Sequence, residues 1–227
     1  MAPVMPAATR ALAGGSEERR VSFDTAGHDC AAEGAGRAGE PPARGAGRED
    51  HRRGWKVDPR YQLQERLGSG SYGCVCRAHD GKTGCPVAIK RTRHLFSDSF
   101  DTKNVLREIC ILSTVSTAKH PNVVQIYDLF APLDPDGNFD EIYLVMEVAD
   151  SDLRKMLKRD FTLSELHVMR LFYTLLLGLR HLHALGVWHR DLKPANCLVN
   201  EGCEVKICDF GLSRALGGPD AAARRAQ

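Results

Sequence analysis

The sequence lacks three features, each of which would assign it to a broad class of protein. No apolar run approaches the roughly 18 residues that a membrane-spanning helix needs. The formal net charge is only +2, so bulk charge gives no attraction to nucleic acid or to a membrane surface. None of the eight cysteines forms the C-x-x-C pair of a zinc site, and no signal peptide precedes them. We therefore expect all eight to be reduced thiols of an intracellular protein.

Residues 1–54 differ in composition from the rest of the chain. Alanine and glycine supply 21 of them, and eight arginines face eight acidic residues. Large apolar residues are so few that burial cannot offset the entropy of ordering, which predicts a disordered tail. A transit peptide is the alternative, and the acidic pair Glu17–Glu18 argues against it. Arg19-Arg20-Val21-Ser22 resembles a site for kinases that read basic residues, or it is a chance match in a charged segment.

From about Trp55 the pattern becomes that of a folded domain. Apolar alternation and short apolar runs predict strands at 61–67, 73–78, 86–90, 123–129 and 142–148, and shorter strands at 197–199 and 205–207. Residues 132–137 have the composition of a turn. Helical spacing predicts a helix over 101–112 with Asp101 as its N-cap. This order of elements predicts an α+β fold in which a small sheet-rich lobe comes first.

A second and longer helix is expected over 164–185. Thr162-x-x-Glu165 resembles the capping box that opens a helix, because each side chain can bond a backbone N–H at the other position. The helix carries one apolar stripe, formed by Met169, Phe172, Leu176 and Leu179. A stripe of this kind needs a covering surface, since large exposed apolar patches favour aggregation or a partner.

A glycine-rich segment joins the first two expected strands in the spacing G-x-G-x-x-G-x-V. Glycines allow a backbone to approach phosphates closely and to present its N–H groups to them. The candidate nucleotide-binding residues are Leu67, Gly68, Ser69, Gly70, Ser71, Tyr72, Gly73, Cys74 and Val75. The same spacing occurs in dinucleotide-binding folds, where the glycines open a helix. Here the chain continues as a strand, which disfavours that reading, and a plain hairpin turn stays open as an alternative.

Lys90 ends the apolar strand Val87-Ala88-Ile89 and lies 15 residues beyond Val75. A lysine in this position is either a solvated strand end or a buried cation with a partner. Glu108, in the expected helix, can be that partner, and the alternative for Glu108 is an ordinary surface charge. A Lys–Glu pair can hold the ammonium group against the α- and β-phosphates of a nucleotide. We therefore expect Lys90 and Glu108 to belong to a catalytic site.

The strongest motif is residues 189–196, His-Arg-Asp-Leu-Lys-Pro-Ala-Asn, which matches H-R-D-L-x-x-x-N. Phosphoryl transfer to a hydroxyl needs a carboxylate that accepts the hydroxyl proton, and Asp191 fits that role. Lys193 can neutralise charge on the transferring phosphate. The amide oxygen of Asn196 is a suitable Mg²⁺ ligand. Asp209 follows 18 residues after Asp191 in an Asp-Phe-Gly triplet and is the second expected Mg²⁺ ligand, with Phe210 as a packing switch.

These motifs resemble those of the eukaryotic protein kinase family over about residues 61–214. A lysine at the position of Lys193, two residues after Asp191, resembles the serine/threonine kinases of that family. The stretches 106–112, 143–153 and 206–214 are similar to the mitogen-activated group. The resemblance implies a protein-kinase-like fold that uses ATP and Mg²⁺ to phosphorylate Ser or Thr. It implies an N-lobe at about 61–146, a hinge at 147–152, a partial C-lobe at 153–214 and an irregular tail at 215–227, all within a kinase domain over 55–227.

The same resemblance assigns residues around the adenosine. Met146 is implied as the gatekeeper, and the backbone of Glu147 and Ala149 is implied to contact adenine. Further contacts are implied for the base and the ribose, by Ala88, Leu198 and Asp152. Cys208 is implied to border this pocket, where it is either open to electrophiles or an inert buried thiol.

The sequence departs from this family after Arg214. A Thr-x-Tyr phosphorylation site, an Ala-Pro-Glu segment, the later helices and an acidic docking site are all missing, and Arg190 has no activation-loop phosphate to bind. We therefore expect the 164–185 stripe to be bare and this chain alone to have little or no kinase activity. The alternative function is a nucleotide-binding regulator that competes for the partners of a longer form. The resemblance further implies a protein substrate, an upstream activating kinase, and a cytoplasmic location that extends to the nucleus.

Overall fold

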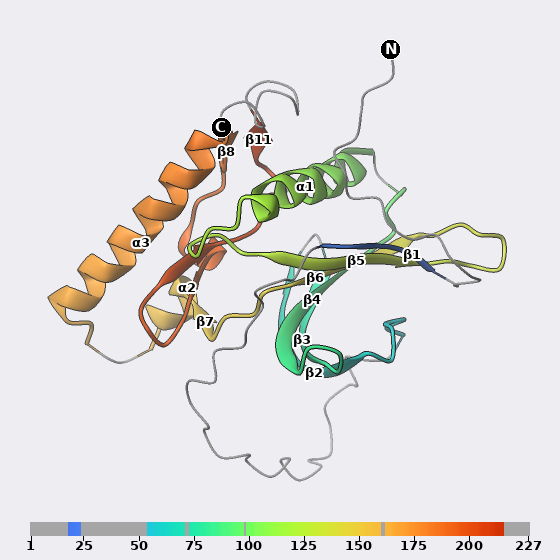
Figure 1. The fold of residues 1–227 in the computed structure, drawn as a ribbon, viewed down its shortest axis with the longest axis horizontal. Helices are drawn as coiled ribbons and strands as arrows, with labels where there is room; N and C mark the ends of the chain where they lie inside the picture. The colour runs from blue at the N-terminus through green and yellow to red at the C-terminus, as the bar shows by residue number, and fades with distance from the viewer. Residues whose placement is uncertain (1–17, 24–53, 71–72, 98, 160–161, 216–227) are drawn as a thin grey trace, which may run out of the picture.

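The computed structural model describes residues 18–23, 54–70, 73–97, 99–159 and 162–215. Six antiparallel strands form the main sheet, in the order β1-β5-β6-β4-β3-β2. Their bounds are β1 Glu18–Ser22, β2 Tyr61–Gly70, β3 Gly73–Asp80, β4 Cys85–Arg93, β5 Ile126–Pro132 and β6 Glu141–Met146. Helix α1 (Ser99–Thr117) lies between β4 and β5 in the chain and above the sheet in Figure 1.

The second half of the chain is helical with short strands. Its elements are β7 Ser151–Asp152, α2 Leu153–Met156, α3 Glu165–Ala184, β8 Val187–Trp188, the 3₁₀ turn η1 Pro194–Asn196, β9 Cys197–Val199, β10 Val205–Ile207 and β11 Arg214–Ala215. Small sheets β10-β9-β7 and β11-β8 lie beside α3 (Figure 1). The expected α+β order, with a sheet-rich lobe first, is confirmed.

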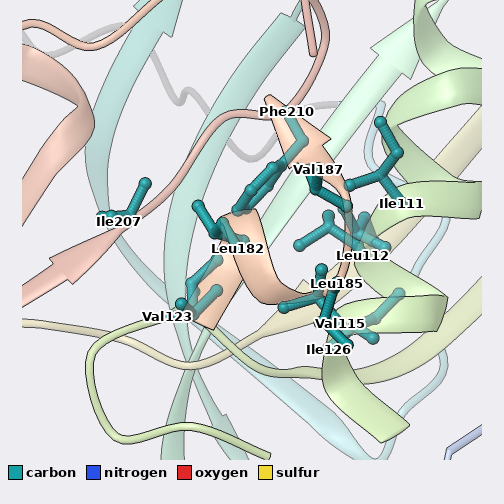
Figure 2. Packing of buried hydrophobic residues seen from close by; sticks show 12 residues of the cluster. Ile111, Leu112, Val115, Val123, Ile126, Leu182, Leu185, Val187, Ile207 and Phe210 are labelled. Carbon is teal, nitrogen blue, oxygen red and sulfur yellow. The ribbon is translucent and has the colours of Figure 1, made fainter. Parts of the chain in front are cut away.

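One apolar core joins the two halves. It contains Ile111, Leu112 and Val115 of α1, Leu144 of β6, Leu182 of α3 and Phe210, all at most 5% exposed. Figure 2 shows Phe210 within this cluster, together with residues from α1 and α3. A core shared by distant segments couples their positions, because interiors are packed too densely for one segment to shift alone.

Helix α3 packs against β10 through a glycine. A Cβ built on Gly178 would lie 2.7 Å from the backbone oxygen of Asn122 and 3.0 Å from Cδ1 of Ile207. The opposite face of α3 is open: Met169, Phe172 and Leu176 are 53, 64 and 56% exposed. The expected bare stripe is confirmed for these three residues and wrong for Leu179, which packs against the shared core.

The helix expected over 164–185 is found at Glu165–Ala184, but the capping residues expected for both helices are wrong. Asp101 is the third residue of α1 rather than its cap. Helix α3 is capped by Ser164, whose hydroxyl accepts a hydrogen bond from the His167 backbone N–H at 3.3 Å. The His167 ring Nδ1 in turn accepts from the Ser164 backbone N–H, so an imidazole completes the capping box that Glu165 was expected to complete.

Three further expectations need correction. The strand expected over 123–129 starts only at Ile126, because the residues before it bond to Ile207 of β10 instead. The tail over 1–54 was expected to be disordered throughout, yet Glu18–Ser22 forms β1 on the edge of the main sheet. Finally, Cys85 is disulfide-bonded, so it is not the reduced thiol that we expected.

Candidate active site

The glycine segment lies in the hairpin between β2 and β3. Gly68 pairs with Val75, Ser69 with Cys74, and Gly70 with Gly73. Gly73 has a φ of 135°, and a Cβ there would lie on the backbone oxygen of Arg91, so only glycine fits. Because these glycines join two strands and open no helix, the dinucleotide-binding alternative is excluded. The predicted contacts of Ser71 and Tyr72 lie outside the described residues.

Lys90 and Glu108 form a buried ion pair between β4 and α1. The Lys90 ammonium donates to both carboxylate oxygens of Glu108, at 2.7 and 2.8 Å. The two side chains are only 13 and 8% exposed. Burial acts to lower the pKa of Lys90, but the nearby charges of Glu108 and Asp209 outweigh it and the pKa is raised. The alternatives of a solvated strand end and a surface glutamate are therefore wrong.

The segment from 189 to 196 brings three predicted side chains together. Lys193 donates to Asp191 Oδ2 at 2.7 Å, and Asn196 Nδ2 donates to the same oxygen at 3.0 Å and to the Asp191 backbone oxygen at 2.9 Å. The hydrogen bond from Lys193 is the main cause that lowers the pKa of Asp191. Asp191 is thus held as an ionised carboxylate, the form that accepts a proton.

His189 positions this segment, and we had not included it among the candidate site residues. It is 3% exposed; one ring nitrogen contacts the Cys208 backbone oxygen at 2.9 Å, and the other accepts from the Asp191 N–H at 3.3 Å. The Ser213 hydroxyl donates to the His189 backbone oxygen at 3.0 Å. The signal was available, since His189 opens the motif, but its contact with Cys208 depends on the tertiary structure.

Asp209 lies next to this cluster, near enough to Lys90 to raise its pKa. Asp209 and Arg190 both have a φ of 67°, a conformation that costs energy for residues other than glycine. The side-chain amide of Asn196 uses its N–H groups on Asp191, which leaves its oxygen for a cation. An amide oxygen and a carboxylate are hard oxygen donors, so the residues fit Mg²⁺.

The residues implied around adenosine lie where the lobes meet. Ala88 of β4 is the register partner of Met146 of β6. Asp152 of β7 is the register partner of Leu198 of β9. The Asp152 carboxylate also caps α2, because it accepts the Lys155 backbone N–H at 2.8 Å. Contacts of these side chains with a nucleotide stay predictions.

The connection after β6 is held by a lysine that the sequence reading passed over. Glu147 donates its backbone N–H to the Gln125 oxygen at 3.0 Å, and its carboxylate pairs with Lys206 at 2.7 Å. Half-buried Ala149 follows in the same connection. Lys206 therefore ties β10 to the hinge, a role that no local pattern could indicate.

A second lysine that was not predicted, Lys155 of α2, contacts the glycine hairpin. Lys155 of α2 donates from Nζ to the Leu67 backbone oxygen at 3.2 Å and contacts Asp152 at 3.3 Å. Lys155 thus links α2 to the glycine hairpin. Cys208 lies near Asp209, Lys90 and Glu108, and burial raises its pKa far above the ordinary thiol value, which favours the inert-thiol alternative.

Among the described residues, no helix is both long and apolar enough to cross a membrane. Comparison with known proteins gives a consistent picture. Residues 61–225 match the protein kinase domain. The chain is 44% identical over 176 residues to "Mitogen-activated protein kinase 12" of Mus musculus, which is 77% of this chain and 47% of that protein.

Two further relatives come from distant organisms. "Mitogen-activated protein kinase 16" of Arabidopsis thaliana is 43% identical over 155 residues, 68% of this chain and 27% of that protein. "Extracellular signal-regulated kinase 1" of Dictyostelium discoideum is 42% identical over 158 residues, 70% of this chain and 29% of that protein. The chain spans less than half the length of each of these relatives. The resemblance to the mitogen-activated group is confirmed, and the chain belongs to the protein kinase family.

Proposed function

We propose that this chain carries the nucleotide site and catalytic residues of a protein serine/threonine kinase of mitogen-activated type, which transfers the γ-phosphate of ATP to a Ser or Thr hydroxyl. The observation that carries the proposal is the Asp191 carboxylate, held by Lys193 at 2.7 Å and by Asn196 at 3.0 Å. An aligned, ionised carboxylate with an ammonium group beside it suits a reaction in which a proton leaves and phosphate charge moves.

In this proposal each residue of the site has a separate role in phosphoryl transfer. Asp191 accepts the proton of the substrate hydroxyl, and Lys193 balances the charge of the phosphate as it transfers. Lys90, fixed by Glu108 at 2.7 Å, holds phosphate oxygens beneath the glycine hairpin. Asn196 and Asp209 would hold Mg²⁺, which when bound neutralises charge on the phosphates. Met146, Glu147, Ala149, Asp152 and Leu198 would enclose the adenosine.

A second candidate function is a nucleotide-binding regulator that competes with a longer kinase for its partners. The observation that favours it is the open face of α3, where Phe172 is 64% exposed and Leu176 is 56% exposed. Apolar surfaces of this kind favour association. For a full-length form of the kinase we further propose a protein substrate, an upstream activating kinase and a cytoplasmic and nuclear location.

Turnover separates the two functions, whereas binding does not. The purified chain would be incubated with Mg²⁺, labelled ATP and a Ser/Thr-containing protein such as myelin basic protein. The first function predicts phosphate transfer that Asp191→Asn lowers by about 10²-fold or more, since the variant loses the proton acceptor. Such transfer would also overturn the expectation that this chain alone has little or no kinase activity. ATP-dependent thermal stabilisation should persist in that variant. Stabilisation by ATP without Asp191-dependent turnover supports the regulator instead, and no stabilisation by ATP contradicts both.

A further inference from the structure

Strand β1 pairs with β5 along its whole length, and one arginine supplies most of its side-chain attachment to the sheet. The Arg20 guanidinium donates to Asp128 from Nε at 2.8 Å and to Asp58 from Nη1 at 2.6 Å. It also lies over the Phe130 ring, 5.5 Å from the centroid. Burial acts to lower the pKa of Arg20, but the hydrogen bonds to Asp128 and Asp58 outweigh it and raise the pKa. Arg20 is therefore the main ionic partner of Asp128, whose side chain is only 2% exposed; the Tyr61 hydroxyl donates to the same carboxylate at 2.7 Å, and Arg60 lies 3.8 Å away.

Ser22 contacts the same carboxylate from the end of the strand. Its hydroxyl donates to Asp128 Oδ1 at 3.1 Å, and Ser22 is the register partner of Asp128 in β5. The hydroxyl is thus part of the attachment of β1. The backbone pairing with β5 over Glu18–Ser22 is the other main attachment. Phe23 adds a backbone bond to the Tyr127 oxygen at 3.1 Å and some packing on the shared core.

Burial of apolar surface contributes little to holding the strand, so the polar contacts of Arg20 and Ser22 are what chiefly oppose its opening. No residue of β1 is fully buried, and Ser22 itself is exposed. Edge strands with little buried apolar surface are the parts of a sheet that open most readily. When β1 opens, Arg19 and Arg20 become free together, three and two residues before Ser22. This is the arrangement that basic-directed kinases read through acidic contacts.

We propose that Ser22 is a phosphorylation site for a separate, basic-directed kinase, and that its phosphate detaches β1 from β5. The Ser22 oxygen forms a bond to the γ-phosphorus of ATP, the bond to the β–γ bridging oxygen breaks, ADP leaves, and the hydroxyl proton passes to the modifying kinase. The proposal does not rest on catalysis by this chain. Its basis is that one exposed hydroxyl, in a basic motif, bonds to a buried carboxylate.

The phosphate acts on the attachment in two ways. It brings a charge of about −1.5 to −2 to a position where a neutral hydroxyl had donated to Asp128, so attraction becomes repulsion. It also competes for Arg20, which lies two residues away on the same face of the strand. Both effects remove the side-chain contacts of β1 and leave the strand held by its exposed backbone ladder and by Phe23. The exposed edge of β5 would then be free to pair with another extended segment.

The test uses the full chain, treated with ATP and the purified catalytic subunit of a kinase that prefers Arg-Arg-x-Ser. Mass spectrometry locates the phosphate, and hydrogen exchange is followed in residues 18–23 and 126–132. We expect phosphate on Ser22, absent in Ser22→Ala. Exchange in both segments should rise by about tenfold, the effect of losing one hydrogen bond to a charged group. Exchange in residues 197–207 should not change, which shows that the chain stays folded.

Two charge variants form a matched pair that needs no modifying kinase. Ser22→Asp places a charge toward Asp128, whereas Val21→Asp places it on the neighbouring residue, which is 40% exposed and on the other face of the strand. Ser22→Asp should raise exchange in 126–132, and Val21→Asp should not. Three results overturn the proposal: no phosphate on Ser22, phosphate without a change in exchange, or equal effects of the two variants.

Discussion

Replacing Glu108 by glutamine tests how much the buried ion pair stabilises the fold. The substitution keeps the shape of the side chain and removes its charge, which leaves the Lys90 ammonium 13% exposed without its partner at 2.7 Å. Breaking a buried pair costs about 3–5 kcal/mol because one charge stays buried and uncompensated. Asp209 lies near enough to act on Lys90, so we expect the lower end, about 3 kcal/mol.

The chain offers a matched control for burial. Arg170 and Glu204 form an ion pair at the same distance, 2.7 Å, but their side chains are 56 and 43% exposed. Exposed pairs contribute about 0–1 kcal/mol, so Glu204→Gln should have a small effect. The free energy of unfolding would be measured for both variants by urea titration with far-UV circular dichroism. Equal losses in the two variants would refute the reasoning from burial.

The Lys90–Glu108 pair also predicts the direction in which the free energy of unfolding changes with pH. The pKa of Lys90 is raised in the folded state, so its contribution is fully present below the ordinary lysine value. The contribution is lost as the pH rises through the raised folded value, at alkaline pH. Glu108→Gln should therefore reduce the difference in stability between pH 8 and strongly alkaline solution, measured by the same titrations.

Three other predictions concern packing and exposure. Gly178→Ala should cost about 1–3 kcal/mol in urea unfolding, because the new Cβ would lie 2.7 Å from the Asn122 backbone oxygen; an unchanged midpoint would contradict the close packing of α3. Cys208 should react with iodoacetamide at pH 8 more slowly than exposed Cys110, because burial raises its pKa, and faster labelling of Cys208 would favour the reactive alternative. Leu176→Glu should leave the free energy of unfolding within about 0.5 kcal/mol, because Leu176 is exposed, and should lower self-association in light scattering. Unchanged scattering would contradict association through this face of α3.

Local patterns were sufficient to predict the chemistry that we propose for the site. The proton acceptor and the two oxygen ligands of the proposal come from the residue types and spacing of 189–196 and Asp209 alone. The strands at 86–90, 197–199 and 205–207 were also predicted close to their observed positions, because apolar runs of this length fit buried strands. The exposed apolar stripe of α3 was also predicted for Met169, Phe172 and Leu176, since the spacing of a stripe is a property of the helix alone.

Other features were decided by contacts between segments far apart in the chain. The sequence suggested that Lys90 and Glu108 form a pair, but the packing of α1 on the sheet decided that they are buried at 2.7 Å. The strand expected at 123 begins late because β10 competes for its backbone bonds. Strand β1 was missed because its attachment is Arg20 reaching Asp128, 108 residues away.

The sequence by itself therefore determined which functional groups the proposed site contains, because reactivity follows from residue type and short spacings. The tertiary structure decided which of those atoms are buried, which pKa values shift, and which charged side chains are used to hold segments in place. These depend on desolvation and on long-range contacts, and neither is a property of a local stretch of chain.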